Sequence, residues 1–219
     1  MKRTLRTLPF LTLAILLAAV TGLASTITDS FSFPTATTPF TVSSSAVPEF
    51  NPSMGTLTSI EFMLSGSTSG TATINNASTM SGTYNFSIQT TLGLLDPTSS
   101  PLLSIAPTFS GTLTVPAGAT ATSGVLTSPT VTDSLLLSTG LGLYEGTGTY
   151  VFTLMGMGLG TATGPTPFTI SENTSDTASG EVIYNFTPAG ATPEPASLFL
   201  LGSGLGLLGF GLRRRGKRS

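Results

Sequence analysis

The hexapeptide SIEFML, residues 59–64, places a large apolar side chain at every second position. In an extended chain, Ile60, Phe62 and Leu64 lie on one face, and the intervening residues lie on the other. This period of two is the pattern of a β-strand with one buried face. The hexapeptide therefore predicts a strand at the centre of the chain.

The same alternation recurs in TYNFSI (83–88), TYVFTL (149–154) and EVIYNF (181–186). Segments rich in Gly, Pro, Asn and Ser separate the runs, which predicts turns at SGSTSG (65–70), NNAS (75–78), LDPT (95–98) and VPAG (115–118). Residues 132–140, TDSLLLSTG, fit either one short helical turn capped by Asp133 or a buried strand.

Many short strands at intervals of about 8–12 residues are typical of an all-β domain. We therefore predict an antiparallel β-sandwich over residues 25–190. A β-solenoid is the alternative, although no fixed internal period supports it.

The basic residues lie only near the two ends of the chain. Residues 25–192 contain nine acids and no Lys, Arg or His, which gives this body a formal side-chain charge of −9. A body without cations cannot neutralise phosphates, so we expect no nucleic-acid partner. The absence of His and Cys excludes a Ser-His-Asp triad, disulfides and Cys or His zinc sites. We predict no cofactor.

Residues 1–24 have the order of a secretory signal peptide. The basic start MKRTLR precedes the apolar run LPFLTLAILLAAV, and TGLAS supplies small residues before a cut at Ser25. An uncleaved N-terminal anchor is the alternative, because the apolar run is a little shorter than a span of about 20 residues. Both interpretations place the body outside the cytoplasm.

Residues 191–219 combine a proline-rich hinge, an apolar run and a basic end. The run 196–212 would reach about 25 Å as a helix, slightly short of a hydrocarbon core of about 30 Å. We predict a single transmembrane helix here, with Arg213, Arg214 and Arg215 on the cytoplasmic side by the positive-inside rule.

The segment that begins at Pro193, Glu194 and Pro195 resembles the PEP-CTERM sorting signal of Gram-negative bacteria. The resemblance implies recognition by exosortase, a membrane protease that removes the tail during export, in species that make exopolysaccharide and biofilm. In addition, residues 47–70 resemble the start of choice-of-anchor E domains. That resemblance implies an extracellular β-rich region without an assigned activity.

Carboxylates and tyrosines are the only ionisable side chains of the body. Two carboxylates close together would suit a secreted carbohydrate-active hydrolase, but the nine acids are scattered along the sequence. Glu172, Asn173 and Asp176 in SENTSD (171–176) are weak candidates for a calcium site in an adhesin, and a polar loop between two strands is the alternative. Four tyrosines are candidates for stacking on sugars or for the core, and these are Tyr84, Tyr144, Tyr150 and Tyr184.

The leading hypothesis is a non-enzymatic, exported surface or matrix protein associated with biofilm or exopolysaccharide. Its expected partners are exosortase and the secretion machinery, the membrane through the C-terminal helix, and exopolysaccharide. The hydrolase and the calcium-stabilised adhesin are the alternatives.

Overall fold

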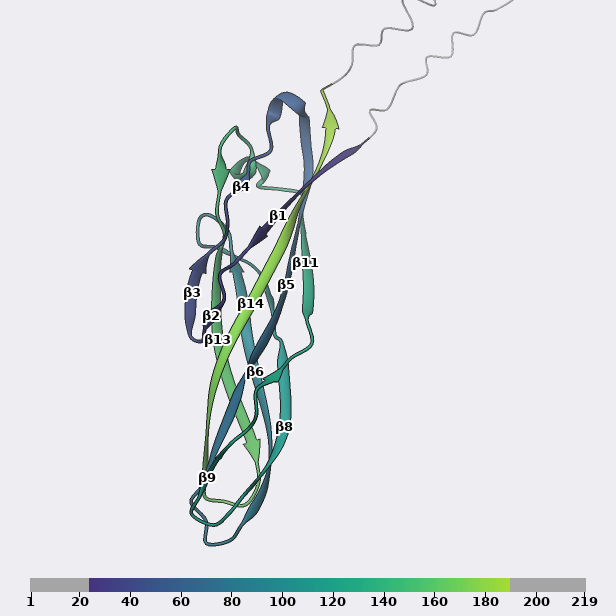
Figure 1. Ribbon diagram of the computed structural model, residues 1–219. Coiled ribbons are helices and arrows are strands. Elements are labelled where there is room, and N and C mark those ends of the chain that lie inside the picture. The colour runs from purple at the N-terminus through teal and green to yellow at the C-terminus, as the bar shows by residue number, and fades with distance from the viewer. Residues whose placement is uncertain (1–23, 190–219) are drawn as a thin grey trace, which may run out of the picture.

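The computed structural model describes residues 24–189, which form an elongated sandwich of two antiparallel β-sheets (Figure 1). The short strands at 47–48 and 149–150 pair with each other as a separate two-stranded sheet. Four long strands run along the molecule: β5 (Gly55–Asn76), β6 (Gly82–Leu95), β13 (Thr153–Thr163) and β14 (Phe168–Pro188). The shorter strands are β1 (Ser25–Ser32), β2 (Ala36–Thr37), β3 (Phe40–Ser43), β4 (Val47–Pro48), β7 (Pro101–Ile105), β8 (Thr108–Val115), β9 (Thr120–Thr122), β10 (Leu126–Thr127), β11 (Val131–Leu137) and β12 (Thr149–Tyr150). Two 3-10 helices, η1 (Pro52–Met54) and η2 (Leu141–Tyr144), are the remaining regular elements of the described residues.

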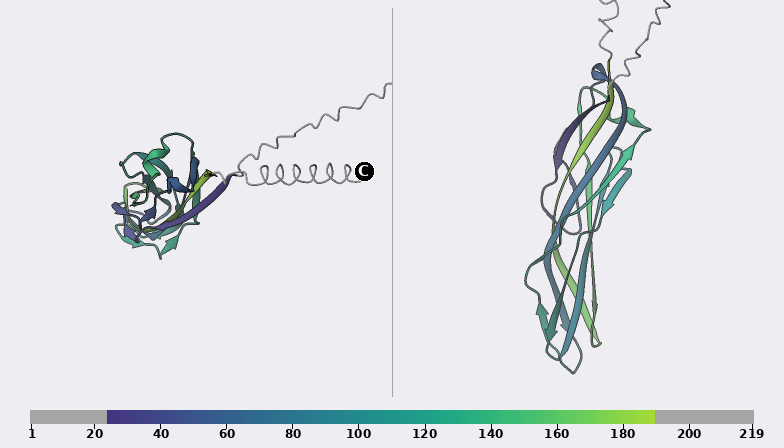
Figure 2. Two further views of the ribbon diagram at one scale, coloured as in Figure 1. Left: turned by 90° about the horizontal axis from the view of Figure 1, so that it is seen from above. Right: turned by 90° about the vertical axis from the view of Figure 1, so that its right-hand side faces the viewer.

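The first sheet, called sheet A, is built around β14 and β5. Strands β1 and β2 pair with the outer edge of β14, while β11, β10 and β9 follow one another along the outer edge of β5. The second sheet, called sheet B, has the order β3, β13, β6. Strands β7 and β8 follow one another along the other edge of β6. Figure 2 shows the two layers from the side and from above. The prediction of an all-β antiparallel sandwich is confirmed.

The strands are longer than the sequence predicts. Strand β5 pairs with β14 from Gly55 to Asn76, and SGSTSG (65–70) lies inside this ladder opposite residues 174–179. The predictions of a turn at 65–70 and of a loop at 171–176 are therefore wrong. The serines of 65–70 remain in the strand because their hydroxyls lie on the outer face and can pair across strands, as Ser67 Oγ and Thr177 Oγ1 do at 3.0 Å.

Residues 131–137 also depart from the expectation. They form the strand β11, which pairs with β5, so the prediction of a helical turn is wrong. The alternative of a buried strand is right about the strand and wrong about the burial, because the side chain of Leu136 is 62% exposed. Strand β11 lies at a sheet edge and covers only part of the core.

The alternating runs supply two separate hydrophobic cores. The proximal core lies at the end where β1 begins and β14 ends, and it includes the buried Phe62, Phe152 and Tyr184. The distal core lies at the other end around Ile74 and Phe86. Phe62, Phe86, Phe152 and Tyr184 belong to the four alternating runs of the sequence. The other large residues on the predicted inner faces of these runs are buried as well: Ile60, Leu64, Tyr84, Ile88, Tyr150, Leu154, Val182 and Phe186.

A buried polar layer separates the two cores. Thr68 of β5, Thr90 of β6, and Thr174 and Asp176 of β14 are each at most 2% exposed. Along each strand they lie between residues of the proximal core and residues of the distal core. In β6, for example, Thr90 lies between Ile88 of the distal core and Leu92 of the proximal core. The long strands therefore connect two apolar cores through a layer of hydroxyls and one carboxyl group.

Candidate functional site

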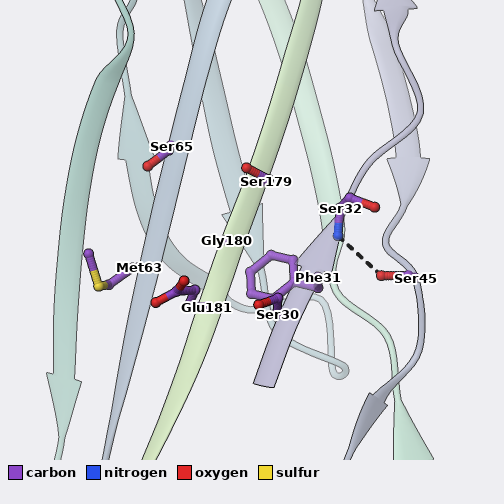
Figure 3. A pocket seen from close by; sticks show the side chains of 9 residues that line it. All are labelled: Ser30, Phe31, Ser32, Ser45, Met63, Ser65, Ser179, Gly180 and Glu181. Atoms are coloured by element: carbon purple, nitrogen blue, oxygen red, sulfur yellow. Dashed lines mark hydrogen bonds between the residues drawn. The ribbon is translucent and has the colours of Figure 1, made fainter. Parts of the chain in front are cut away.

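The outer face of sheet A carries a shallow groove lined mainly by serines, which we call the serine groove (Figure 3). Its volume is about 410 Å³, and it crosses β1, β14 and β5. The lining residues are Ser30, Phe31, Ser32, Ser45, Met63, Ser65, Ser179, Gly180 and Glu181. Five of these nine residues are serines, so hydroxyls dominate the polar atoms that a ligand would meet.

The ladder register brings these serines together from distant parts of the sequence. Ser179 lies between Ser32 of β1 and Ser65 of β5, and Glu181 lies opposite Ser30. All of these positions alternate with inward-facing residues, so their side chains share the outer face. The groove is therefore a consequence of pairing between three strands that are far apart in the chain.

Backbone contacts fix the groove at its β1 side. Ser45 donates its backbone N–H to the carbonyl oxygen of Ser32 at 2.9 Å, and its Oγ accepts from the N–H of Ser32 at 3.1 Å (Figure 3). Gly180 is required at the centre of the groove, because a Cβ atom there would lie 2.2 Å from the carbonyl oxygen of Met63 and 2.4 Å from the ring of Phe31. The missing side chain lets β1 and β14 pack closely beneath the groove.

A second hollow of about 310 Å³ continues the surface from Ser65 and Ser179 toward the middle of the molecule. It adds Ser67, Thr130 and Thr177 to the lining. Two hydroxyl pairs bridge adjacent strands along this surface, Ser65 with Thr132 at 2.7 Å and Ser67 with Thr177 at 3.0 Å. The two hollows together form an extended track of hydroxyls.

The charge of the groove is negative and weak. Glu181 is its one carboxylate, and no cation lies anywhere in residues 24–189. Hydroxyls both donate and accept hydrogen bonds, which suits the hydroxyls of a sugar. The groove can thus hydrogen-bond a neutral polyhydroxylated ligand, whereas it offers no cation to balance the charge of a phosphate or a sulfate.

The four tyrosines lie in the cores and not on the surface. Tyr84, Tyr144, Tyr150 and Tyr184 are at most 8% exposed. The hydroxyls of Tyr150 and Tyr184 lie 2.6 Å apart, and that of Tyr184 also donates to the carbonyl oxygen of Pro48 at 2.8 Å. Burial raises the pKa of Tyr184 to about 12 and raises the pKa of Tyr150 and Tyr144 as well. These rings build the core and cannot stack on a sugar.

The structure does not bring the three calcium candidates together. Glu172, Asn173 and Asp176 all lie in β14, where Asn173 is on the exposed outer face and the other two are on the inner face. Glu172 lies over the inner side of β13, where a Cβ atom on Gly160 would be 2.6 Å from its Oε2. In residues 24–189 no three acidic side chains gather as metal ligands.

Asp176 is the acid most changed by its surroundings. Its Oδ1 accepts a hydrogen bond from Thr68, and its Oδ2 has no partner in the described part of the chain. Burial raises the pKa of this carboxyl above its ordinary value, although the nearby hydroxyls of Thr68 and Thr90 oppose the shift. Because the residue is 2% exposed, a polysaccharide cannot reach it.

Several predicted segments lie outside the described residues. These are the signal peptide (1–24, of which Ala24 alone is described), the motif Pro193, Glu194 and Pro195, the C-terminal helix, and the tail with Arg213, Arg214 and Arg215. Between residues 24 and 189 the structure contains no helix long and apolar enough to cross a membrane.

Sequence reasoning missed the serine groove, although its signal is present. Serine occupies alternate positions in SGSTSG (65–70), and Ser, Asn or Thr occupies alternate positions in SENTSDTAS (171–179). An interpretation of these segments as strands, rather than turns, would place a row of hydroxyls on one face of each. Only the register shows that the two rows are neighbours.

Comparison with known proteins identifies the C-terminal segment. The model of the PEP-CTERM protein-sorting motif matches residues 191–215. The chain therefore carries this motif, which marks an exported, cell-surface-associated protein that is processed by an exosortase. No curated protein matches the chain, and the resemblance of residues 47–70 to choice-of-anchor E domains stays a prediction.

The solved structures that match this chain are only distantly similar to it. A chain of infectious bursal disease virus, Gx strain, is 10% identical over 80% of this chain and 43% of the viral one, with a TM-score of 0.20. A chain of the T=1 particles derived from this virus is 12% identical over 76% of this chain and 37% of the viral one, with a TM-score of 0.18. This chain thus spans less than half the length of either viral chain. Similarity at this level carries no argument about function.

Proposed function

We propose that the protein is a non-enzymatic component of the cell surface or extracellular matrix that adheres to neutral exopolysaccharide through the serine groove. The observation that carries this proposal is the continuous track of outward hydroxyls on sheet A, on a body that contains no cation. The sorting motif at 191–215 supports the compartment in which such a ligand is found.

Charge selects between classes of polysaccharide. Nine acids without a compensating base repel uronic acids, sulfated sugars and other anionic polymers. A neutral glucan or galactan meets no such barrier, and its hydroxyls pair with those of Ser30, Ser32 and Ser179, which are exposed. We therefore expect neutral polymers to bind and anionic polymers not to bind.

The groove favours weak, repeated binding over tight capture of one sugar. It is open and shallow, and the four tyrosines that would supply stacking are buried. Many copies along one polymer compensate for a low affinity at each site, because linked sites act at a high effective concentration. Adhesion of a dense surface layer fits this regime.

Removing groove hydroxyls should weaken adhesion. In the double variant Ser30→Val and Ser179→Val, two exposed hydroxyls are lost while β-propensity is kept. At about 0.5–1.5 kcal/mol for each hydrogen bond, we expect retention of the full-length protein on an immobilised neutral glucan to fall by about tenfold. Affinity electrophoresis in gels containing neutral or anionic polysaccharide measures this.

The matched control is the double variant Ser110→Val and Thr112→Val, which removes two exposed hydroxyls from β8 on the outer face of sheet B. It should bind as the native protein does. An equal loss in the control, or equal binding of neutral and anionic polymers, would contradict the role of the groove. Shortening of the glucan during incubation would instead favour the carbohydrate-active hydrolase.

The sorting motif offers a separate test. With Pro193, Glu194 and Pro195 all replaced by alanine, exosortase should no longer recognise the chain, and unprocessed protein should accumulate in the membrane fraction of a host that has this enzyme. Immunoblots of membrane and extracellular fractions measure the change. Ser203→Ala, which alters the apolar run and leaves Pro193, Glu194 and Pro195 intact, should be processed normally. Normal processing of the triple variant would contradict the assignment of these three residues.

A further inference from the structure

Strand β13 leaves part of one edge without a partner. It pairs with β6 along its whole length but with β3 only from Thr153 to Gly156. Within residues 24–189, no strand pairs with the other edge from Met157 to Thr163, a segment that we call the free edge. The backbone N–H and C=O groups of such an edge are a template for another strand.

The same strand carries a stripe of exposed apolar side chains. Met155, Met157 and Leu159 lie on its outer face and are 46%, 68% and 61% exposed. A hollow of about 500 Å³ lies beside them, with Phe40 and Gly93 in its lining. Three large apolar residues in a row, two of which lie on the free edge, are costly to leave in water, and they mark an interaction surface.

Charge limits what can cover this surface. Residues 146–171 contain no charged side chain, so β13 is neutral in a body of charge −9. Glu172, which approaches Gly158 and Gly160, does so from the inner side and leaves the outer face neutral. Natural edge strands are often protected by lysine, and the body has none. The outer faces of two acidic bodies can thus meet at this edge with no charged side chain of β13 between them.

The free edge is also complementary to itself. We propose that a second copy of the chain pairs its own free edge with this one, antiparallel, about a two-fold axis at Gly160. The seven residues of the free edge then overlap completely, with Met157 opposite Thr163 and Leu159 opposite Thr161 of the second copy. The two Leu159 side chains become diagonal neighbours on one continuous outer face, within reach of one another.

This symmetry fixes the orientation of the copies. The two-fold axis reverses the long axis of the second copy, and β1 and β14 place residues 25 and 188 at one end of each body. Residue 188, which precedes the sorting segment in the sequence, therefore lies at opposite ends of the dimer in the two copies. This geometry excludes pairing of two copies anchored side by side in one membrane. It allows pairing of copies that have been released from the membrane, as the proposed sorting implies.

Cysteine cross-linking tests the register, because the chain has no native cysteine. Leu159→Cys and Thr161→Cys are prepared separately as full-length protein in detergent micelles. Mixed and oxidised, they should form a disulfide-linked dimer, because residues 159 and 161 of the two copies are directly opposed. Each variant alone should give at least fivefold less disulfide-linked dimer. In a single variant the two cysteines are diagonal neighbours, about 7–8 Å apart, which is too distant for a disulfide. Equal cross-linking in all three samples, or none in the mixture, would overturn the register.

A charge placed on the edge tests the interface itself. Leu159→Lys should weaken the dimer at least tenfold in sedimentation velocity of the full-length protein in micelles. Met80→Lys introduces the same charge at a residue that is 70% exposed and outside β13, and it should leave the dimer intact. If Leu159→Lys fails to fold, Met157→Lys places the same charge on the free edge and should weaken the dimer in the same way. A native protein that is monomeric at all concentrations, or an equal effect of Met80→Lys, would overturn the proposal. The alanine variant of the sorting motif should dimerise normally, which separates this test from that of the proposed function.

Discussion

Asp176→Asn will make the protein more stable above pH 7, and the gain will vanish near pH 3. The buried Oδ2 of Asp176 and the buried Oγ1 of Thr90 both lack a hydrogen-bond partner in the described part of the chain. An amide nitrogen in place of Oδ2 can donate to Thr90, while the amide oxygen still accepts from Thr68. Since an unsatisfied buried polar group costs about 1–3 kcal/mol, we expect the free energy of unfolding at pH 8 to rise by about this amount.

The sign of the pH dependence follows from the raised pKa of Asp176. Below the ordinary Asp value of 3.8 the carboxyl is protonated in both the folded and the unfolded chain, and it imposes no penalty. As the pH rises from there through the raised pKa of the folded state, the unfolded chain loses its proton first, and native stability falls. The asparagine variant lacks this titration.

Chemical denaturation at a series of pH values between 3 and 8 measures the difference. The curves of the native and Asp176→Asn proteins should meet near pH 3 and separate as the pH rises. Glu61→Asn, which changes an acid on the outer face of β5, controls for the loss of one negative charge. Parallel curves for the native and Asp176→Asn proteins would contradict the account of the polar layer.

Phe62→Ala will cause the largest loss of stability. Phe62 is 0% exposed in the proximal core, where its ring centroid is 5.1 Å from that of Tyr144 and 5.6 Å from that of Phe152. Removing a buried phenylalanine ring costs about 3–5 kcal/mol, because burial and aromatic contacts are lost and a cavity remains. The melting temperature should fall by about 2–4 °C for each kcal/mol.

The distal core supplies the matching experiment. Phe86→Ala removes a ring that is 3% exposed, at the other end of the molecule. Because β5, β6 and β14 run through both cores and the polar layer, both variants should still unfold in a single transition. Leu136→Ala, at a residue 62% exposed, should change stability by no more than about 0.5 kcal/mol. Two transitions in either phenylalanine variant would show that the polar layer divides the body into independent units.

Periodicity predicted the buried faces well. In the four alternating runs, each large side chain assigned to an inner face is buried, from Ile60 to Phe186. Turn prediction was less successful, because glycine and serine at 65–70 lie within a 22-residue strand. Local composition favours a turn there, but pairing with β14 on one side and with β10 and β11 on the other overrides it.

The sequence alone determined the fold class, the cation-free body and the sorting motif, since each is a property of composition, local period or a short contiguous run. Tertiary structure decided which strands are neighbours. That choice set Ser32, Ser65 and Ser179 side by side on one face, placed Asp176 against Thr68 in the interior, and left β13 with a free edge. The reason is physical: a period of two specifies the face on which a side chain lies, whereas register and partner follow from long-range pairing and burial across the whole sandwich.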